Sequence, residues 1–76
     1  MSIPNGRIEI DPRKCHGRPV IRGTRVPVSI ITGSLAGGMS MEEVAREYDV
    51  AIEDIQAALA YVTELIDSEH HFPLAG

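Results

Sequence analysis

Apolar residues in the last third of the chain recur at spacings of three and four residues. Between positions 52 and 70 the repeat consists of Ile52, Ile55, Leu59, Val62 and Ile66. This spacing puts side chains on one face of an α-helix, so we expect a long helix over residues 52–70 with these five residues on its inner face. At 1.5 Å per residue this helix is roughly 27 Å long.

Two shorter helices are predicted ahead of the long one. Residues 26–38 open with a proline and close with two glycines, which suit the first turn and the end of a helix. Residues 40–48 open with Ser40 followed by Glu43, the pattern of a capping box. Gly33 either costs up to about 1 kcal/mol relative to alanine or permits a close neighbour. The expected inner faces are Val28, Ile31 and Leu35, then Val44, Ala45 and Tyr48.

The first third of the chain predicts two short strands. Residues 7–11 alternate charged and apolar side chains before a proline, and residues 18–23 carry two β-branched residues bounded by glycines. The strands pair as a small hairpin, or each pairs with the same strand of a second chain. Alternation within the second strand places Arg18, Val20 and Arg22 on one side and Ile21 on the other.

Together these elements predict a mainly α fold, in which short N-terminal β-strands or a hairpin precede a three-helix bundle. We expect a single domain over residues 1–76, made of a basic β arm (1–25), a helical region (26–70) and a tail (71–76). Residues 41–60 have the layout of a helix-turn-helix. Asp49 stands at the turn position where glycine is usual, and aspartate tolerates left-handed geometry.

A chain of 76 residues is small, and a domain of this size buries only about 60 to 65% of its unfolded surface. Its one cysteine excludes an internal disulfide, and no cysteine–histidine set has the spacing of a zinc site. Association of two chains is the remaining source of stability, so we expect a homodimer. The expected dimer or partner surface is Tyr61, Leu65 and Ile66, with Phe72 beyond them. Alternatively these residues cover the edge of the small core.

Charge is divided unevenly along the chain. Residues 1–27 hold six basic and two acidic residues, a net charge of +4, whereas residues 28–76 hold one basic and nine acidic residues, a net charge of −8. Such a division indicates an anionic partner at the basic end, unless the two parts attract each other within the fold or a dimer.

The stretch GRPVIRGTRVPV, residues 17–28, gathers three arginines in a turn-rich segment. Guanidinium groups suit phosphates and carboxylates because they offer a planar fork of donors. The alternative is that one of the last two arginines pairs with an internal carboxylate such as Asp11 and fixes the loop. The candidate residues for binding nucleic acid or another anionic partner are Arg18, Arg22 and Arg25, with Arg13 and Lys14 nearby.

The second helix of the helix-turn-helix is poorly suited to contact DNA bases. It begins with IEDIQ, in which Glu53 and Asp54 repel phosphates and only Gln56 suits a base. The two carboxylates suit the N-terminus of a helix instead, so we expect the helical pair to serve as scaffold.

No residue pattern indicates an enzyme. Cys15 and His16 are neighbours in a segment expected to be extended, where neighbours point to opposite faces and form no nucleophile–base pair. His70 and His71 have no carboxylate spaced to complete a metal site, and a glycine-rich phosphate loop is missing. We therefore expect no cofactor and no metal. A polar N-terminus and the lack of about 20 consecutive apolar residues predict a cytoplasmic protein that does not enter a membrane.

Two long segments carry a resemblance to a known family. IEIDPRKCHGRPVIRGTRVPVSII, followed by LAGGMSMEEVAREYDVAIEDIQAALAYV, resembles the domain-of-unknown-function family 433 of small prokaryotic proteins over residues 7 to 63. The resemblance implies a helix-turn-helix core of the homeodomain-like type, and some members are regarded as VapB-type antitoxins that accompany a toxin with a PIN-like nuclease fold. Family members often have threonine or serine where this chain has Ala51, which forfeits about 0.5 to 2 kcal/mol of helix capping.

The sequence therefore predicts a small regulatory module that dimerises and either neutralises a PIN-like nuclease toxin, binds its own operator DNA, or does both. The alternative is a pure protein–protein interaction and dimerisation module without DNA binding.

Overall fold

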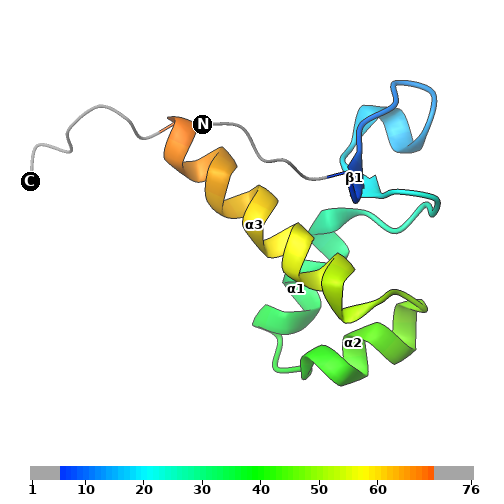
Figure 1. Ribbon diagram of the computed structural model, residues 1–76, viewed down its shortest axis with the longest axis vertical. Coiled ribbons are helices and arrows are strands. Elements are labelled where there is room, and N and C mark those ends of the chain that lie inside the picture. Colours follow the sequence, from blue (N-terminus) through cyan, green and yellow to red (C-terminus); the bar gives the residue numbers. More distant parts are fainter. Residues whose placement is uncertain (1–5, 70–76) are drawn as a thin grey trace, which may run out of the picture.

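The computed structural model describes residues 6–69, and it shows a mainly α protein with a small β-hairpin at its start (Figure 1). The tail predicted over residues 71–76, together with His70, His71 and Phe72, lies outside the described residues. The elements in chain order are β1 (Ile8–Glu9), a turn of 3₁₀ helix (Cys15–Gly17), β2 (Val20–Ile21), α1 (Val28–Ala36), α2 (Met41–Tyr48) and α3 (Ile52–Glu69). The predicted hairpin and the three predicted helices are all present.

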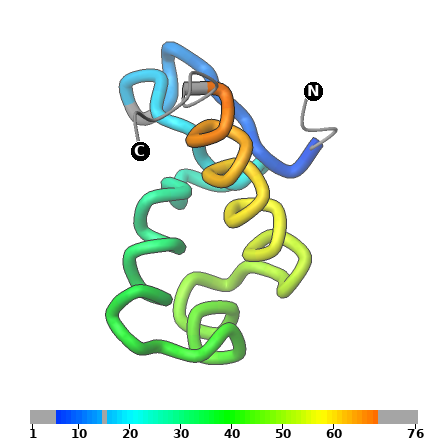
Figure 2. Tube along the Cα trace, turned by 90° about the vertical axis from the view of Figure 1, so that its left-hand side faces the viewer, coloured from blue at the N-terminus to red at the C-terminus, as the bar shows by residue number. Residues whose placement is uncertain are grey.

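The three helices and the hairpin surround one small core. In Figure 2, α1 and α3 lie on opposite sides of the molecule, α2 closes one end and the arm closes the other. The longest helix, α3, contacts α1, α2 and β1. Among residues 6–69, the buried apolar side chains are Val20, Ile21, Val28, Ile31, Val44, Ile55 and Ala58.

The hairpin strand β2 is paired on both of its edges. On one side it runs antiparallel to β1, with Ile8 opposite Ile21. On the other side the chain turns back after residue 25, so that the N–H of Ile21 donates to the carbonyl of Val26 at 2.9 Å. The hydroxyl of Thr24 holds this turn, because it donates to the Ile21 carbonyl at 2.7 Å and accepts from the Val26 N–H at 3.0 Å.

Both residues of β2 are buried, with Val20 at 0% and Ile21 at 1% exposure. Ile21 belongs to the core cluster formed with the helices, whereas Val20 is buried outside that cluster. Burial of both residues is therefore compatible with the expected alternation. The return of the chain after residue 25 explains why α1 begins at Val28, since Pro27 is still extended and forms a bridge with Val20.

The inner face of α3 differs from the prediction at two positions. Ile55 and Ala58 are buried, but Leu59 is 40% exposed and Ile66 is 54% exposed. In a straight α-helix, residues spaced by exactly seven positions rotate gradually away from one face. One turn after Ile55, the residue that faces the core is therefore Ala58 and not Leu59. Ile66 is exposed because the last turns of α3 extend beyond α1 (Figure 1).

Local signals at the helix ends are confirmed. Ser40 and Glu43 form the capping box at the start of α2, in which the Ser40 hydroxyl accepts from the Glu43 N–H and the Glu43 carboxylate accepts from the Ser40 N–H. These contacts with the backbone and side chain of Ser40 lower the pKa of Glu43. Asp49 adopts the left-handed conformation, with φ of 55°, and so ends α2 as expected.

Glycines 33 and 38 provide a matched test of backbone freedom. A Cβ atom added at either position would meet no atom within 4 Å, so Gly33 is not required by a close neighbour. The two glycines differ in backbone conformation, because Gly38 has a φ of +108°. We expect Gly33→Ala to raise the free energy of unfolding by up to about 1 kcal/mol and Gly38→Ala to lower it, because only the latter strains the backbone. Thermal and urea unfolding followed by circular dichroism measures both; a destabilised Gly33→Ala variant would contradict the prediction.

Candidate functional site: the basic arm and the α1–α3 groove

Three of the basic residues in the arm are paired with carboxylates. Lys14 Nζ lies 3.1 Å from Glu9 Oε1, and Arg13 Nε lies 3.4 Å from Asp11 Oδ1. Hydrogen bonding to Lys14 is the main cause that lowers the pKa of Glu9. The Arg13 side chain is nevertheless 91% exposed, and an exposed ion pair of this kind contributes little to stability. Arg13 thus keeps an accessible charge, although it is one of the paired residues.

The third pair connects the arm to the helices. Arg7 Nη1 lies 2.9 Å from Asp54 Oδ1, across 47 positions of sequence. The other oxygen of the same carboxylate accepts from the N–H of Ala51 at 2.9 Å. Asp54 therefore supplies the carboxylate half of a capping box to α3, whose hydroxyl half is missing at Ala51, and at the same time fixes the arm.

Arg18 and Arg22 make hydrogen bonds to neutral oxygens. Arg18 Nη2 donates to Ser29 Oγ on α1 at 3.0 Å, and Arg22 Nε donates to the backbone carbonyl of Gly6. Asp11, the carboxylate named as a possible partner of Arg22 or Arg25, accepts hydrogen bonds from Arg13. The arginine-rich stretch directs Arg18 toward α1 and Arg22 toward the chain ahead of β1, while Arg25 is exposed on the intervening turn.

The loop between the strands is a tight turn, which corrects the expectation of an extended segment around Cys15 and His16. The N–H of Lys14 donates to the Asp11 carbonyl, and the N–H of Gly17 donates to the Lys14 carbonyl. His16 and Gly17 both have positive φ, at 58° and 80°. Within residues 6–69, no three histidine, cysteine, aspartate or glutamate residues gather in a way that would hold a metal ion.

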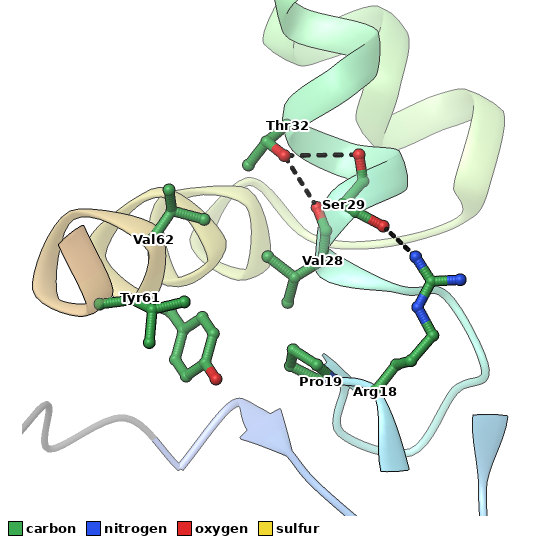
Figure 3. A pocket seen from close by; sticks show the side chains of 8 residues that line it. Arg18, Pro19, Val28, Ser29, Thr32, Tyr61 and Val62 are labelled. Carbon is green, nitrogen blue, oxygen red and sulfur yellow. Dashed lines mark hydrogen bonds between the residues drawn. The ribbon is translucent and has the colours of Figure 1, made fainter. Parts of the chain in front are cut away.

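A groove of about 200 Å³ lies between the first turn of α1 and the middle of α3 (Figure 3). Its apolar side chains come from both helices and from Pro19. Arg18 lies at its edge, where its guanidinium bonds to Ser29, while the Thr32 hydroxyl turns back to carbonyl oxygens of its own helix. The residues that line this α1–α3 groove are Arg18, Pro19, Val28, Ser29, Thr32, Tyr61, Val62 and Leu65.

The residues predicted for a dimer or partner surface divide between the groove and the end of α3. Tyr61 is half-buried against the core and lines the groove, and Leu65 lines it at 46% exposure. Ile66 follows directly on the same helix and is still more exposed. The structure thus brings two of the three predicted residues together with Arg18.

Sequence reasoning placed Asp54 at the N-terminus of the helix but did not identify its bonds to Ala51 and Arg7, nor the role of Ser29. One signal for Asp54 is present in the sequence, because it stands three residues after Ala51, the position from which a carboxylate reaches back to the N-cap N–H. The approach of Ser29 to Arg18, and of Arg7 to Asp54, depends on tertiary packing.

Comparison with known proteins places the chain in a family. The family described as Protein of unknown function (DUF433) matches residues 8–62, so the chain belongs to this family. A curated relative from Mycobacterium tuberculosis, named "Putative antitoxin VapB45", is 33% identical over 55 residues, which are 72% of this chain and 23% of the relative. The chain therefore spans about a quarter of the length of that relative.

Two solved structures share the fold. A DUF433 member protein from Anabaena variabilis superimposes with a TM-score of 0.71 and 34% identity, over 87% of this chain and 68% of that chain. The crystal structure of Rv2018 from Mycobacterium tuberculosis gives a TM-score of 0.63 and 35% identity, over 68% of this chain and 24% of that chain.

Within residues 6–69, no helix is long and apolar enough to cross a bilayer.

The double role of Asp54 can be tested by substitution. Asp54→Ala removes both the bond to the Ala51 N–H and the ion pair with Arg7, so we expect the free energy of unfolding to fall by about 1 to 2 kcal/mol. Asp54→Asn keeps an oxygen for the Ala51 N–H and should cost less than Asp54→Ala. Urea unfolding at fixed protein concentration measures both, and equal losses would show that the backbone hydrogen bond contributes nothing.

Proposed function

We propose that this chain is an antitoxin-like regulatory module of the cytoplasm, that it acts as a homodimer, and that it neutralises a nuclease toxin with a PIN-like fold. Membership of the DUF433 family and the similarity to a protein named as an antitoxin favour a regulatory module over an enzyme. The observation that carries the proposal is the acidic surface of α2, α3 and the turn between them.

This acidic surface is defined by Glu42, Glu43, Glu47, Asp49 and Glu53, all of which are exposed. Arg46 is the one basic residue between positions 28 and 69. A nuclease must bind RNA phosphates, so the cleft of such a toxin is positively charged, and an acidic surface complements it. Complementarity of this kind accelerates association and discriminates against acidic partners.

Binding of operator DNA is a second part of the proposal, and it is assigned to the arm. Residues 41–60 have a helix-turn-helix layout, but Glu53 is exposed and Asp54 is committed to Ala51 and Arg7, so the start of α3 is unsuited to phosphates. Arg13, Arg22 and Arg25 are exposed on the arm, and we assign the phosphate contacts to their guanidinium groups. A protein–protein interaction module without DNA binding is the second candidate, favoured by the same acidic α3.

The antitoxin role is tested with the product of the neighbouring reading frame. We expect that product to cleave a fluorescent RNA, and a stoichiometric amount of this chain to suppress the cleavage. A Glu47→Lys/Glu53→Lys variant should inhibit at least about tenfold less well, because it reverses charge on the acidic surface, while Arg46→Gln, which makes the same surface more acidic, should inhibit at least as well as the wild type. Unchanged cleavage in the presence of the wild-type chain would overturn the antitoxin role.

The DNA role is tested by fluorescence anisotropy with the duplex upstream of the chain's own reading frame and a scrambled duplex, each at low and physiological salt. We expect selective binding, and we expect Arg22→Ala/Arg25→Ala to weaken it and to reduce the salt slope by about 1 per lost phosphate contact. Arg46→Ala, on α2, is the control with unchanged affinity. Equal weak binding to both duplexes would leave the protein-interaction module as the function.

A further inference from the structure

The core face of α3 continues past the body of the protein. Leu65 and Ile66 follow Val62 at spacings of three and four residues, so they lie on the same helical face as Val62 and the buried Ala58. The first turn of α1 reaches only the level of Tyr61, Val62 and Leu65, with which it forms the groove. Figure 1 shows the last turns of α3 extending beyond α1.

An uncovered apolar helix end of this kind is unfavourable in water. Most helical stability in proteins comes from packing of an apolar face, and short isolated helical segments are marginal. Leu65 and Ile66 are nevertheless 46% and 54% exposed, although the helix continues through Glu69. These adjoining exposed residues offer an apolar contact surface at the helix end.

The α1–α3 groove can accept a side chain from such a surface. A cavity of about 150 Å³ is enough for a benzene molecule, and the groove measures about 200 Å³, which leaves room for an aliphatic side chain. At its edge Arg18 donates to the neutral Ser29 hydroxyl, and within residues 6–69 no carboxylate forms an ion pair with it. The groove therefore combines apolar walls with an unneutralised positive charge.

The end of α3 has the complementary chemistry. It presents Ile66 beside the exposed Asp67, and the sequence of α3 contains five acidic residues and no basic residue. Two α3 helices paired along their full length would place like charges together, which is unfavourable. Packing of the α3 end against the groove of another copy instead brings carboxylates toward Arg18.

We infer that the α1–α3 groove is the self-association site of this chain, in which Ile66 of a second copy enters the groove and the acidic end of its α3 faces Arg18. This inference rests on the proposed function only in taking the active form to be a homodimer. The contact is reciprocal, because each copy contributes both a groove and an α3 end, and such a two-fold arrangement closes at two chains.

The test uses two charge-reversed variants of the full chain. Arg18→Glu places a carboxylate opposite Asp67 of the second copy, and Asp67→Lys places a cation opposite Arg18 of the second copy. We expect each variant alone to self-associate at least about tenfold more weakly than the wild type in sedimentation velocity, because like charges meet twice in each dimer. Mixing the two variants should restore a dimer containing one copy of each, identified by its mass in native mass spectrometry.

Controls separate this contact from other effects of the substitutions. Arg46→Glu, on α2 and outside the groove, should dimerise like the wild type, and Ile66→Ala should weaken dimerisation with the helical circular dichroism signal unchanged. If the wild type is a dimer but the two charge-reversed variants do not form a mixed dimer, the groove is not the self-association site, although the chain is still a homodimer. A wild type that stays monomeric would overturn both the groove contact and the homodimer. The RNA-cleavage assay tests the antitoxin role separately.

Discussion

One face of α3 determines where almost every other element lies. α1, α2 and β1 all contact this helix, and Ile55 and Ala58 are the α3 residues buried at the centre. Ala58 permits close approach because it is small, and Ile55 fills the space between the helices and Ile21. Because the core is small, each element has few apolar contacts. The orientation of α3 therefore fixes the positions of the hairpin, the groove and the acidic surface.

Polar contacts hold the arm against the helices, because the small core alone gives it few apolar contacts. Asp54 holds Arg7 and the first turn of α3 with a single carboxylate, and Arg18 holds α1 through Ser29. Internal pairs engage both carboxylates of the arm, Glu9 and Asp11. Arg13, in an exposed ion pair, and Arg18 and Arg22, bonded to neutral oxygens, keep positive charge accessible on the arm.

Local sequence signals predicted the helices and their ends to within about two residues, because caps and periodicity act over a few positions. Ser40, Glu43 and Asp49 behave as their patterns indicate. Failures occur where a distant segment decides the outcome: Pro27 is extended because it pairs with Val20, and Ile66 is exposed because α1 ends its cover of α3 earlier. Among the candidate site residues, the clustering of charge predicts the arginines and the helical pattern predicts the α3 surface, whereas the contact of Arg18 with Ser29 required the fold.

The shortness of the two strands has a consequence for how copies of the chain can meet. β2 has no free edge, since β1 pairs with one side and the returning chain with the other. β1 consists of only Ile8 and Glu9, with Lys14 folded onto the Glu9 carboxylate and Pro12 shortly after. Such an edge offers too few unpaired backbone groups to template a growing sheet, and its charges discourage strand addition. A concentrated solution of this chain is thereby protected from fibrous, amyloid-like stacking through the arm.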